Sequence, residues 1–405
     1  MDAPVPHRST AASSTTSTAS ATGRTTTGAF RPDTGVIAEM IGRPMRFDSP
    51  GYPPDETYAE VAADRVRRAW RSLGLTGESH ASVLALLQEL TQPWGGRPVG
   101  TPPERAGWVA IDGSPFEPSV AWAGDQAGVR LSLEAPGDGT AFSRMRDGMA
   151  FTRRLAGRPG VSLDRLLAIE DLFIDEDPQG YFTLAHAVAW RPGADPEYKI
   201  FLNPAVAGRE RSAQRTARAM RTLGLHTPWQ ALANHLGGEF GPAHEPVAIA
   251  LDLTGGPDFR AQLYFAHSGV GPADIDAKAA IARDHVPGLF TRALEQINGP
   301  YGTAAWRRKP PVTTFTLDTR HDLPSATVYV PLIPVHDHDA AARDRVAAFL
   351  RSEGSLSADP YSKLLDDLAD RPLTESLTQN FISYRGGDTP RFSVYLAPGL
   401  YRATP

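Results

Sequence analysis

Cysteine is absent from this 405-residue sequence. Its absence excludes disulfide bonds, thiolate metal sites and cysteine nucleophiles. The sequence also lacks any run of about 18 apolar residues, the length that a membrane-spanning helix needs. Basic residues are not in excess, because 41 Lys and Arg face 46 Asp and Glu, for a formal net charge of −5. Proteins that bind nucleic acids are usually basic overall, so we expect neither a nucleic-acid nor a membrane partner; a local basic pocket is still compatible with this composition.

The N-terminal segment has little that a folded core needs. It is a low-complexity stretch of Ser, Thr and Ala without an apolar run. Such a segment is neither a secretion signal nor a core element. We therefore predict a disordered tail over residues 1–30 and one folded domain over residues 31–405, located in the cytoplasm as a monomer or homodimer.

What the sequence does contain is a long internal repeat. Five times, two helical patterns are followed by two alternating strands joined by a short turn. The first strands of the five pairs begin near Ser119, Tyr181, Pro246, Val312 and Asn380, a spacing of 62 to 68 residues. A repeat of this period indicates one structural unit used five times. Sequential strand pairs favour an antiparallel sheet, and closing that sheet removes its exposed edges.

The repeat therefore predicts an α+β fold: a ten-stranded antiparallel β-barrel of five ααββ units. A ring of ten strands is wider than one of eight, whose side chains about fill its interior. The helices do not fit inside the ring, so we expect them on its outer surface and a ligand-sized space within. The helical patterns cover residues 56–73, 79–90, 143–155, 162–173, 209–223, 228–236, 272–283, 286–297, 338–351 and 361–368.

Polar and charged residues alternate with apolar ones on the second strand of each pair. Since successive side chains point to opposite faces, these rows are expected to point into the barrel. The rows are Arg130, Ser132 and Glu134; Lys199 and Phe201; Arg260, Gln262 and Tyr264; Thr327 and Tyr329; and Arg391, Ser393 and Tyr395.

Four of the five rows carry a cation, and three carry a tyrosine. Buried cations without a partner are costly, so the rows predict an anionic ligand. Arginine forks and a lysine charge suit a diphosphate, and tyrosine faces suit a carbocation. The alternative is that these residues lie on the outer face and pair with helix carboxylates.

A glutamate precedes the first strand in the segment DGSPFEPSVAW. Glu117 lies there among apolar and aromatic neighbours. A carboxylate in such surroundings can accept a hydrogen bond from an indole N–H or take a proton. A solvated glutamate beside a turn is the alternative interpretation.

These segments together resemble the aromatic prenyltransferases of the dimethylallyltryptophan synthase family. The resemblance rests on DGSPFEPS, VRLSLE, K-x-F followed by NP, R-x-Q-x-Y, T-x-Y and FSVYL-x-P, in this order and strand phase. It extends from about Glu56 to the C-terminus, and the composition is similar to that of bacterial members that prenylate tryptophan. The resemblance implies a barrel of repeated α-β-β-α units and catalysis without a metal or other cofactor.

The resemblance also implies roles for individual residues. Glu117 matches the glutamate that binds the indole nitrogen. The positions that match diphosphate ligands are Arg130, Lys199, Arg260 and Tyr264, and Tyr329 and Tyr395 match tyrosines that shield the allyl cation and help to hold the diphosphate. The backbone at Trp108 and Val109 is the expected site for the carboxylate of the acceptor.

Several positions depart from the pattern of the family. Gln262 stands where many members have lysine, Phe201 replaces a tyrosine, and Thr327 replaces a glutamine. Arg391 occupies a usual tyrosine position, where it is expected to supply a charge to the diphosphate. The lysine that removes the final ring proton in many members has no evident match. His186 lies on the corresponding strand and is the candidate base, with a packed barrel histidine as the alternative.

We accordingly expect metal-independent transfer of a dimethylallyl group from dimethylallyl diphosphate to L-tryptophan, at ring carbon C6. An alternative acceptor is another indole or a phenol, such as a tryptophan-containing cyclic dipeptide. A different class of protein, a barrel that carries an anionic isoprenoid without turnover, would have no use for Glu117.

Two further motifs look like metal sites. Asp366–Asp370 reads D-D-x-x-D, but the second acidic motif that magnesium–diphosphate sites need is absent from the sequence. We interpret it as the solvated end of an outer helix. His336–Asp339 comes where a strand ends and a helix begins, so we expect Asp339 to cap the helix rather than bind a metal.

Overall fold

The computed structural model describes residues 45–46, 51–75, 80–124, 126–180, 182–238, 240, 243–257, 259–299, 304–354 and 356–403. The tail expected over residues 1–30 lies outside this part of the chain. Among the described residues, none of the helices has the length and apolar content of a transmembrane segment.

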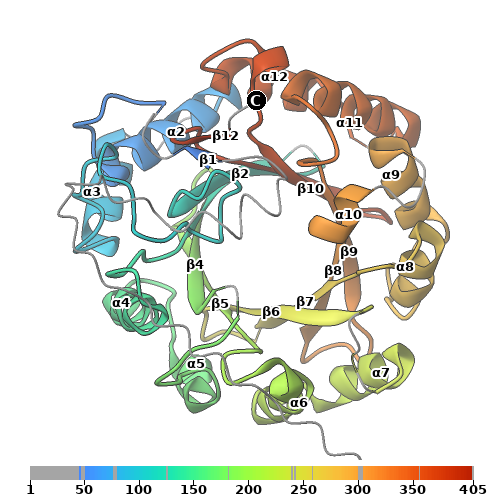
Figure 1. The fold of residues 1–405 in the computed structure, drawn as a ribbon. Helices are drawn as coiled ribbons and strands as arrows, with labels where there is room; N and C mark the ends of the chain where they lie inside the picture. The colour runs from blue at the N-terminus through green and yellow to red at the C-terminus, as the bar shows by residue number, and fades with distance from the viewer. Residues whose placement is uncertain are drawn as a thin grey trace, which may run out of the picture. The chain divides into compact units, whose positions relative to one another are not determined.

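Ten strands form one closed barrel, as Figure 1 shows along its axis. Neighbouring strands pair antiparallel, and the order around the ring is β10-β11-β2-β3-β4-β5-β6-β7-β8-β9. The fold predicted from the five-fold repeat is therefore confirmed. The strands are β2 (Phe116–Ala123), β3 (Gln126–Leu133), β4 (Leu184–Trp190), β5 (Glu197–Leu202), β6 (Glu245–Asp252), β7 (Arg260–Ala266), β8 (Val312–Asp318), β9 (Ser325–Pro331), β10 (Gln379–Arg385) and β11 (Arg391–Leu396). Two short strands, β1 (Met45–Arg46) and β12 (Arg402–Ala403), pair separately.

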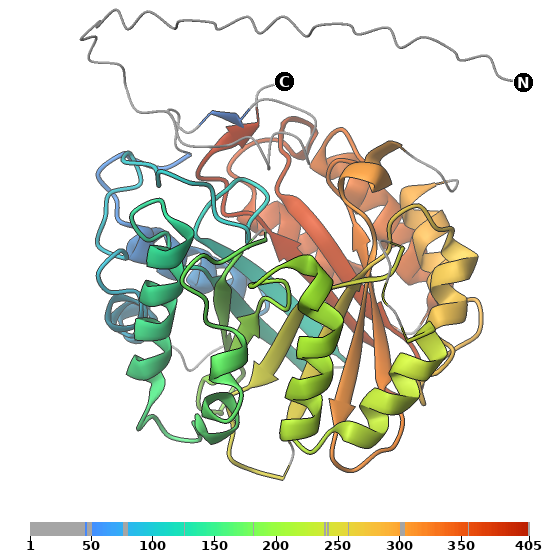
Figure 2. The same cartoon turned by 60° about the horizontal axis from the view of Figure 1, so that its bottom comes forward.

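Helices surround the barrel, and the outer ring is visible from two directions in Figures 1 and 2. The helices are α2 (Tyr58–Ser72), α3 (His80–Leu90), α4 (Ala141–Leu155), α5 (Asp164–Leu167), α6 (Ser212–Thr222), α7 (His226–Leu236), α8 (Pro272–Ala279), α9 (Leu289–Asn298), α10 (Ala304–Arg308), α11 (Asp339–Glu353) and α12 (Asp359–Leu368). A capping box begins α2, since Thr57 Oγ1 accepts from Glu60 N and Glu60 Oε2 accepts from Thr57 N.

Two differences from the predicted helices concern the second unit and the rim. The pattern over residues 162–173 forms only the four-residue α5 and a single 3₁₀ turn, η1 (Glu170–Leu172). Leu166, Ile169 and Phe173 are nevertheless buried as the pattern required, so short turns satisfy the same apolar spacing. The additional α10 lies at the rim of the barrel, on the inner side of the ring of helices in the view of Figure 1.

The hydrophobic core lies between the outer face of the barrel and the helices. On β7, Ala261, Leu263 and Phe265 are fully buried, and Phe265 packs on Phe240 at a ring-centroid distance of 5.1 Å. The alternate residues of β7 are only partly buried although protein surrounds them. Solvent therefore reaches the interior of the barrel, which is the behaviour expected of a ligand-binding space rather than a packed core.

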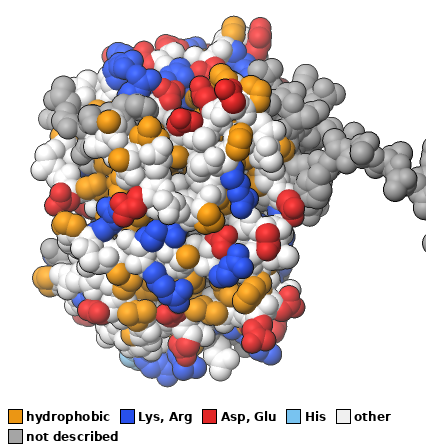
Figure 3. All heavy atoms as spheres, turned by 90° about the vertical axis from the view of Figure 1, so that its left-hand side faces the viewer, with side chains coloured by type: hydrophobic (Ala, Val, Ile, Leu, Met, Phe, Trp, Pro, Cys, Tyr) orange, Lys and Arg blue, Asp and Glu red, His pale blue; other side chains and the backbone are white. Residues whose placement is uncertain are grey.

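The outer surface carries charges of both signs. On the face in Figure 3, Lys and Arg side chains are interspersed with Asp and Glu side chains. In the barrel interior, by contrast, positive charge dominates at one end, as described below.

The two acidic motifs have structural partners. Asp370, just beyond α12, is within 2.7 Å of Arg68 and also pairs with Arg65. The expected helix cap is wrong by one residue: His338 caps α11 through its Nδ1, and the buried Asp339 accepts hydrogen bonds from Thr378 N and Gln379 N. Asp339 thus joins the helix to the start of β10, because a buried carboxylate requires donors around it.

Candidate active site

Three cations of the predicted rows lie together inside the barrel, on alternate strands. Lys199 on β5 and Arg260 on β7 both contact Asp252 on the strand between them: Lys199 Nζ is 3.1 Å from Asp252 Oδ1, and Arg260 NH2 is 2.7 Å from Asp252 Oδ2. Gln262 Oε1 accepts a further hydrogen bond from Lys199. The sequence analysis missed Asp252 because it considered only the second strand of each pair. Asp252 lies on the first strand of its pair, where it points into the barrel in the same row as Ala248 and Ala250.

The third cation, Arg130 on β3, is held by hydroxyls. Its NH2 donates to Ser393 Oγ on β11 at 2.9 Å, across the intervening β2. Its guanidinium therefore points into the lumen with a neutral partner. A guanidinium in this setting keeps donors for a planar anion such as a phosphate.

More arginines gather at the end of the barrel where the hairpins turn. Arg391 begins β11, and its pKa is lowered to about 10 by burial and by the neighbouring Arg385, Arg260, Arg191 and Arg130. Arg385 on β10 has one acidic partner, Asp284, at 3.5 Å. Mutual repulsion of this kind indicates a local excess of positive charge. An anion with several oxygens would relieve it.

An aromatic wall lies beside the cations. The rings of Tyr264 and Tyr329 are 5.7 Å apart, those of Tyr329 and Tyr395 are 5.5 Å apart, and Phe201 lies 5.9 Å from Tyr264. The hydroxyl oxygens of Tyr329 and Tyr395 are 3.1 Å apart. Burial raises the pKa of Tyr264 above its ordinary value, so the phenol stays neutral. Neutral phenol rings present electron-rich faces that stabilise a cation nearby.

Glu117 lies in the same lumen, on β2, with only 5% of its surface exposed. Its Oε1 accepts a hydrogen bond of 2.5 Å from Asn380 Nδ2. Burial raises the pKa of Glu117 to about 8, against the opposing effects of the Asn380 hydrogen bond and of Lys309. A carboxyl with this pKa is poised between its two protonation states near neutrality, which suits a group that binds an N–H donor or moves a proton.

The register places Glu117 apart from the cations along the barrel axis. Glu117 is paired with Ser132 and Arg130 with Ser119, so Arg130 is two residues nearer the hairpin end. Two residues of a strand span about 7 Å. The interior therefore has two compartments, a cationic one beside the aromatic wall and one around Glu117.

Solved structures similar to this chain include enzymes named as dimethylallyltryptophan synthases and as a prenyltransferase. A 6-dimethylallyltryptophan synthase from Micromonospora olivasterospora, solved in complex with DMASPP and Trp, is 29% identical, with a TM-score of 0.79 and coverage of 86% of this chain and 99% of its own. A 5-dimethylallyltryptophan synthase from Streptomyces coelicolor is 26% identical, with a TM-score of 0.76 and coverage of 85% and 98%. The prenyltransferase PriB is also 26% identical, with a TM-score of 0.77 and coverage of 86% and 98%. No protein-family model matches the chain.

The chain is an aromatic prenyltransferase, similar in fold and sequence to the dimethylallyltryptophan synthases. The fold, the aromatic wall and the cationic end of the lumen agree with this assignment. For individual residues the structure gives positions, which we use below as the basis of proposals.

The histidine predicted as the base does not face the lumen of this prenyltransferase. His186 pairs with Leu133 and Ile200, and all three side chains lie on the outer face of the barrel. Its Nε2 is 2.8 Å from Thr152 Oγ1 on α4, and its ring is 4.2 Å from that of Phe151. The expectation that His186 removes the ring proton is therefore wrong, because the strand phase points Ala185 and Ala187 inward instead.

The segment expected to bind the acceptor carboxylate is held by another carboxylate. Trp108 N donates to Glu134 Oε2 at 2.5 Å, and Glu134 also pairs with the buried Arg144 of α4. Glu134 was expected in the inner row of β3, but β3 ends at Leu133 and Glu134 anchors this segment instead. The Trp108 ring stacks on Phe182 at 4.3 Å. Trp108 N thus already has an acceptor, which leaves Val109 as the remaining candidate at this position.

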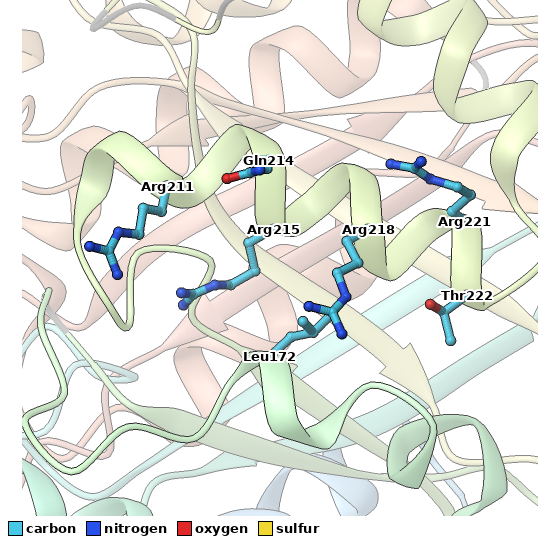
Figure 4. A pocket seen from close by; sticks show the side chains of 7 residues that line it. All are labelled: Leu172, Arg211, Gln214, Arg215, Arg218, Arg221 and Thr222. Carbon is cyan, nitrogen blue, oxygen red and sulfur yellow. The ribbon is translucent and has the colours of Figure 1, made fainter.

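A hollow on the outside of the barrel is a separate feature. It lies along α6 and is lined by Leu172, Arg211, Gln214, Arg215, Arg218, Arg221 and Thr222 (Figure 4). In the close-up, Arg218 extends towards Leu172 of η1. Arg218 is 3.6 Å from Asp171, so an acidic neighbour already offsets part of this charge. None of these residues belongs to the lumen rows. Among the described residues, no group of three or more His, Asp or Glu is arranged to hold a metal ion.

Proposed function

We propose that this prenyltransferase transfers the dimethylallyl group of dimethylallyl diphosphate to a ring carbon of L-tryptophan, without a metal cofactor. The observation that carries the proposal is the arrangement inside the barrel. A cationic compartment beside a wall of tyrosines lies nearer the hairpin end of the lumen, and a buried carboxylate, Glu117, lies further from that end. These are the groups needed to hold a diphosphate, a cation and an N–H donor.

In the first step the C–O bond between the allyl group and the diphosphate breaks, and its electron pair goes to the diphosphate oxygen. Arg130, Lys199 and Arg260 are proposed to stabilise the charge that develops on this leaving group, with Arg391 at the end of the barrel. Fixed cations in an enclosed site stabilise such charge without reorganisation, which is why we assign the role to side chains and not to a metal. Gln262, Tyr264, Tyr329 and Tyr395 complete the diphosphate and cation contacts.

In the second step the aromatic ring attacks the allyl cation, so a carbon–carbon bond forms and the ring becomes positively charged. The tyrosines are proposed to exclude water, which would otherwise convert the cation to an alcohol. Glu117 is proposed to accept the indole N–H and to stabilise the positive ring. Loss of the ring proton to a base then restores aromaticity. Since His186 faces outward, we assign no side chain to that last transfer.

Tryptophan is favoured as acceptor because two similar bacterial enzymes are named dimethylallyltryptophan synthases. Attack at C6 is proposed from the same comparison, in which the enzyme at 29% identity is a 6-dimethylallyltryptophan synthase and one at 26% is a 5-dimethylallyltryptophan synthase. We place the reaction in the cytoplasm, where free tryptophan is available.

The test is incubation of the purified protein with dimethylallyl diphosphate, L-tryptophan and excess chelator. Tryptophan carrying one dimethylallyl group is expected by mass spectrometry, and NMR of that product gives the ring position. A cyclic dipeptide and a phenol are run in parallel as alternative acceptors. Tight binding of dimethylallyl diphosphate with no product from any acceptor would instead identify a carrier.

A further inference from the structure

A buried lysine with no role in the steps above lies next to the Glu117 compartment. Lys309 follows α10 at the rim and is 3% exposed. Its Nζ donates to the backbone oxygen of Asn380 at 2.8 Å and to Asn380 Oδ1, and it lies 4.0 Å from the ring centroid of Phe381. A lysine ammonium has three N–H donors, and this site offers two oxygens and an aromatic face. The surroundings are therefore those of a fixed ammonium group.

Asn380 connects this lysine to Glu117. Its Oδ1 accepts from Lys309, and its Nδ2 donates to Glu117 Oε1 at 2.5 Å. An asparagine amide has one accepting and one donating end, so the lysine selects the orientation in which the donating end faces Glu117. The side chain of Asn380 reaches this position at a register shift of β10, between Gln379 and Phe381.

We propose that Lys309 is a positioning residue for Glu117: its charge favours the carboxylate form, and through Asn380 it orients the second carboxylate oxygen towards the acceptor N–H. This inference rests on the proposed function for the identity of the acceptor. It requires only that an N–H donor meets Glu117 in the lumen. Lys309 itself is not proposed to touch either substrate.

Lys309 contributes a positive charge that favours ionisation of Glu117, beside the hydrogen bond from Asn380. Burial raises the pKa of Glu117 to about 8, and Lys309 is the cation that opposes this increase. Asp112, from the segment before β2, acts in the opposite direction. On β3 the residue paired with Glu117 is Ser132, and on β11 Tyr395 is paired with Ser119, two residues along β2 from Glu117; neither Ser132 nor Tyr395 carries a charge near neutrality. Burial likewise lowers the pKa of Lys309 to about 7, and Glu117 opposes that decrease.

The sign of the effect follows from these contacts. Without the lysine charge, the pKa of Glu117 rises further, so a smaller fraction is ionised at neutral pH. One pKa unit changes that fraction about tenfold below the pKa. Raising the pH restores the carboxylate in the variant, whereas damage to the packing of the site would not be repaired by pH.

The test compares Lys309→Met with Lys309→Arg, which keeps the charge. The pH profile of kcat/KM is measured for dimethylallyl diphosphate and tryptophan, and inorganic diphosphate binding is measured by calorimetry. For Lys309→Met we expect a loss of about tenfold or more at pH 7, recovery to within a few-fold of wild type at about pH 9.5, and unchanged diphosphate binding. For Lys309→Arg we expect the wild-type profile. A loss of equal size at every pH, or an unshifted acid limb, would overturn the inference.

A second readout does not depend on turnover. The carboxyl carbon of Glu117 is titrated by ¹³C NMR in protein labelled at glutamate, with Glu117→Gln to assign the signal. The titration midpoint is expected to move up by about one unit or more in Lys309→Met. An unchanged midpoint refutes the inference even if the wild type is active. A moved midpoint supports it even if tryptophan is not the acceptor. If Lys309→Met does not fold, Lys309→Gln removes the same charge and is expected to shift the midpoint in the same direction.

Discussion

Replacing Glu117 by glutamine removes a charge from the lumen with almost no change of volume. The glutamine oxygen is needed by Asn380 Nδ2, which now donates to Glu117 Oε1. The glutamine amide nitrogen then faces the acceptor, so two N–H donors meet. The carboxylate attraction for the positively charged ring is lost as well.

The size of the effect can be worked from that geometry. A hydrogen bond to a charged group contributes roughly 1.5–3 kcal/mol. A unit charge about 5 Å from the positive ring contributes about 3 kcal/mol at an effective dielectric constant of about 20. Both figures describe one interaction, so they are not added. The expected loss of about 3 kcal/mol corresponds to a rate decrease of about two orders of magnitude.

The assay is the single-turnover rate of Glu117→Gln with tryptophan, together with calorimetric binding of inorganic diphosphate. Diphosphate binding is expected to be unchanged, because Arg130 is two residues nearer the hairpin end than Glu117. Ser132→Ala is the matched control, since Ser132 is paired with Glu117 and is uncharged. A Glu117→Gln rate within a few-fold of wild type, or equal losses of rate and diphosphate binding, would refute the role assigned to Glu117.

Three further predictions concern other parts of the barrel. Asp252→Asn removes the carboxylate that Lys199 and Arg260 share, so we expect the free energy of unfolding to fall by about 1–2 kcal/mol. Diphosphate is then expected to raise the Tm of the variant by more than it raises that of wild type. An equal rise in both proteins would contradict this pairing. His186→Gln is expected to keep turnover within a few-fold. Burial lowers the pKa of His186 from 6.5 to about 3, so the unfolded chain binds a proton that the folded chain does not. His186 therefore destabilises the fold as pH falls below about 6.5, and the variant should unfold at a lower pH in a circular-dichroism titration; turnover that collapses at every pH would instead restore His186 as the base. Tyr264→Leu opens the aromatic wall, so gas chromatography is expected to show more dimethylallyl alcohol per prenylated product, and an unchanged ratio would argue against shielding by Tyr264.

The alternating pattern predicted much of the architecture because a strand has only two faces. Leu263 and Phe265 are buried against the helices while Gln262 and Tyr264 line the lumen, as the period of two requires. The same rule applied to the first strand of a pair would have found Asp252. It would also have excluded His186, whose phase on β4 points it outward.

Other features depend on contacts between distant parts of the chain. Asn380 faces Glu117 because of a register shift in β10, and a periodic pattern gives no sign of such a shift. Lys309 reaches Asn380 from a loop 71 residues earlier, so only the closed barrel brings them together. Glu134 was predicted in the inner row because it continues the alternation of Arg130 and Ser132, but β3 ends one residue before it.

A crystal structure of this protein with dimethylallyl thiolodiphosphate and L-tryptophan would test the central claim most directly. The account predicts the diphosphate among Arg130, Lys199 and Arg260, the allyl group against Tyr264, Tyr329 and Tyr395, and the indole nitrogen within hydrogen-bonding distance of Glu117. An indole that lies away from Glu117, or a diphosphate bound outside the barrel beside the arginines of α6, would contradict it.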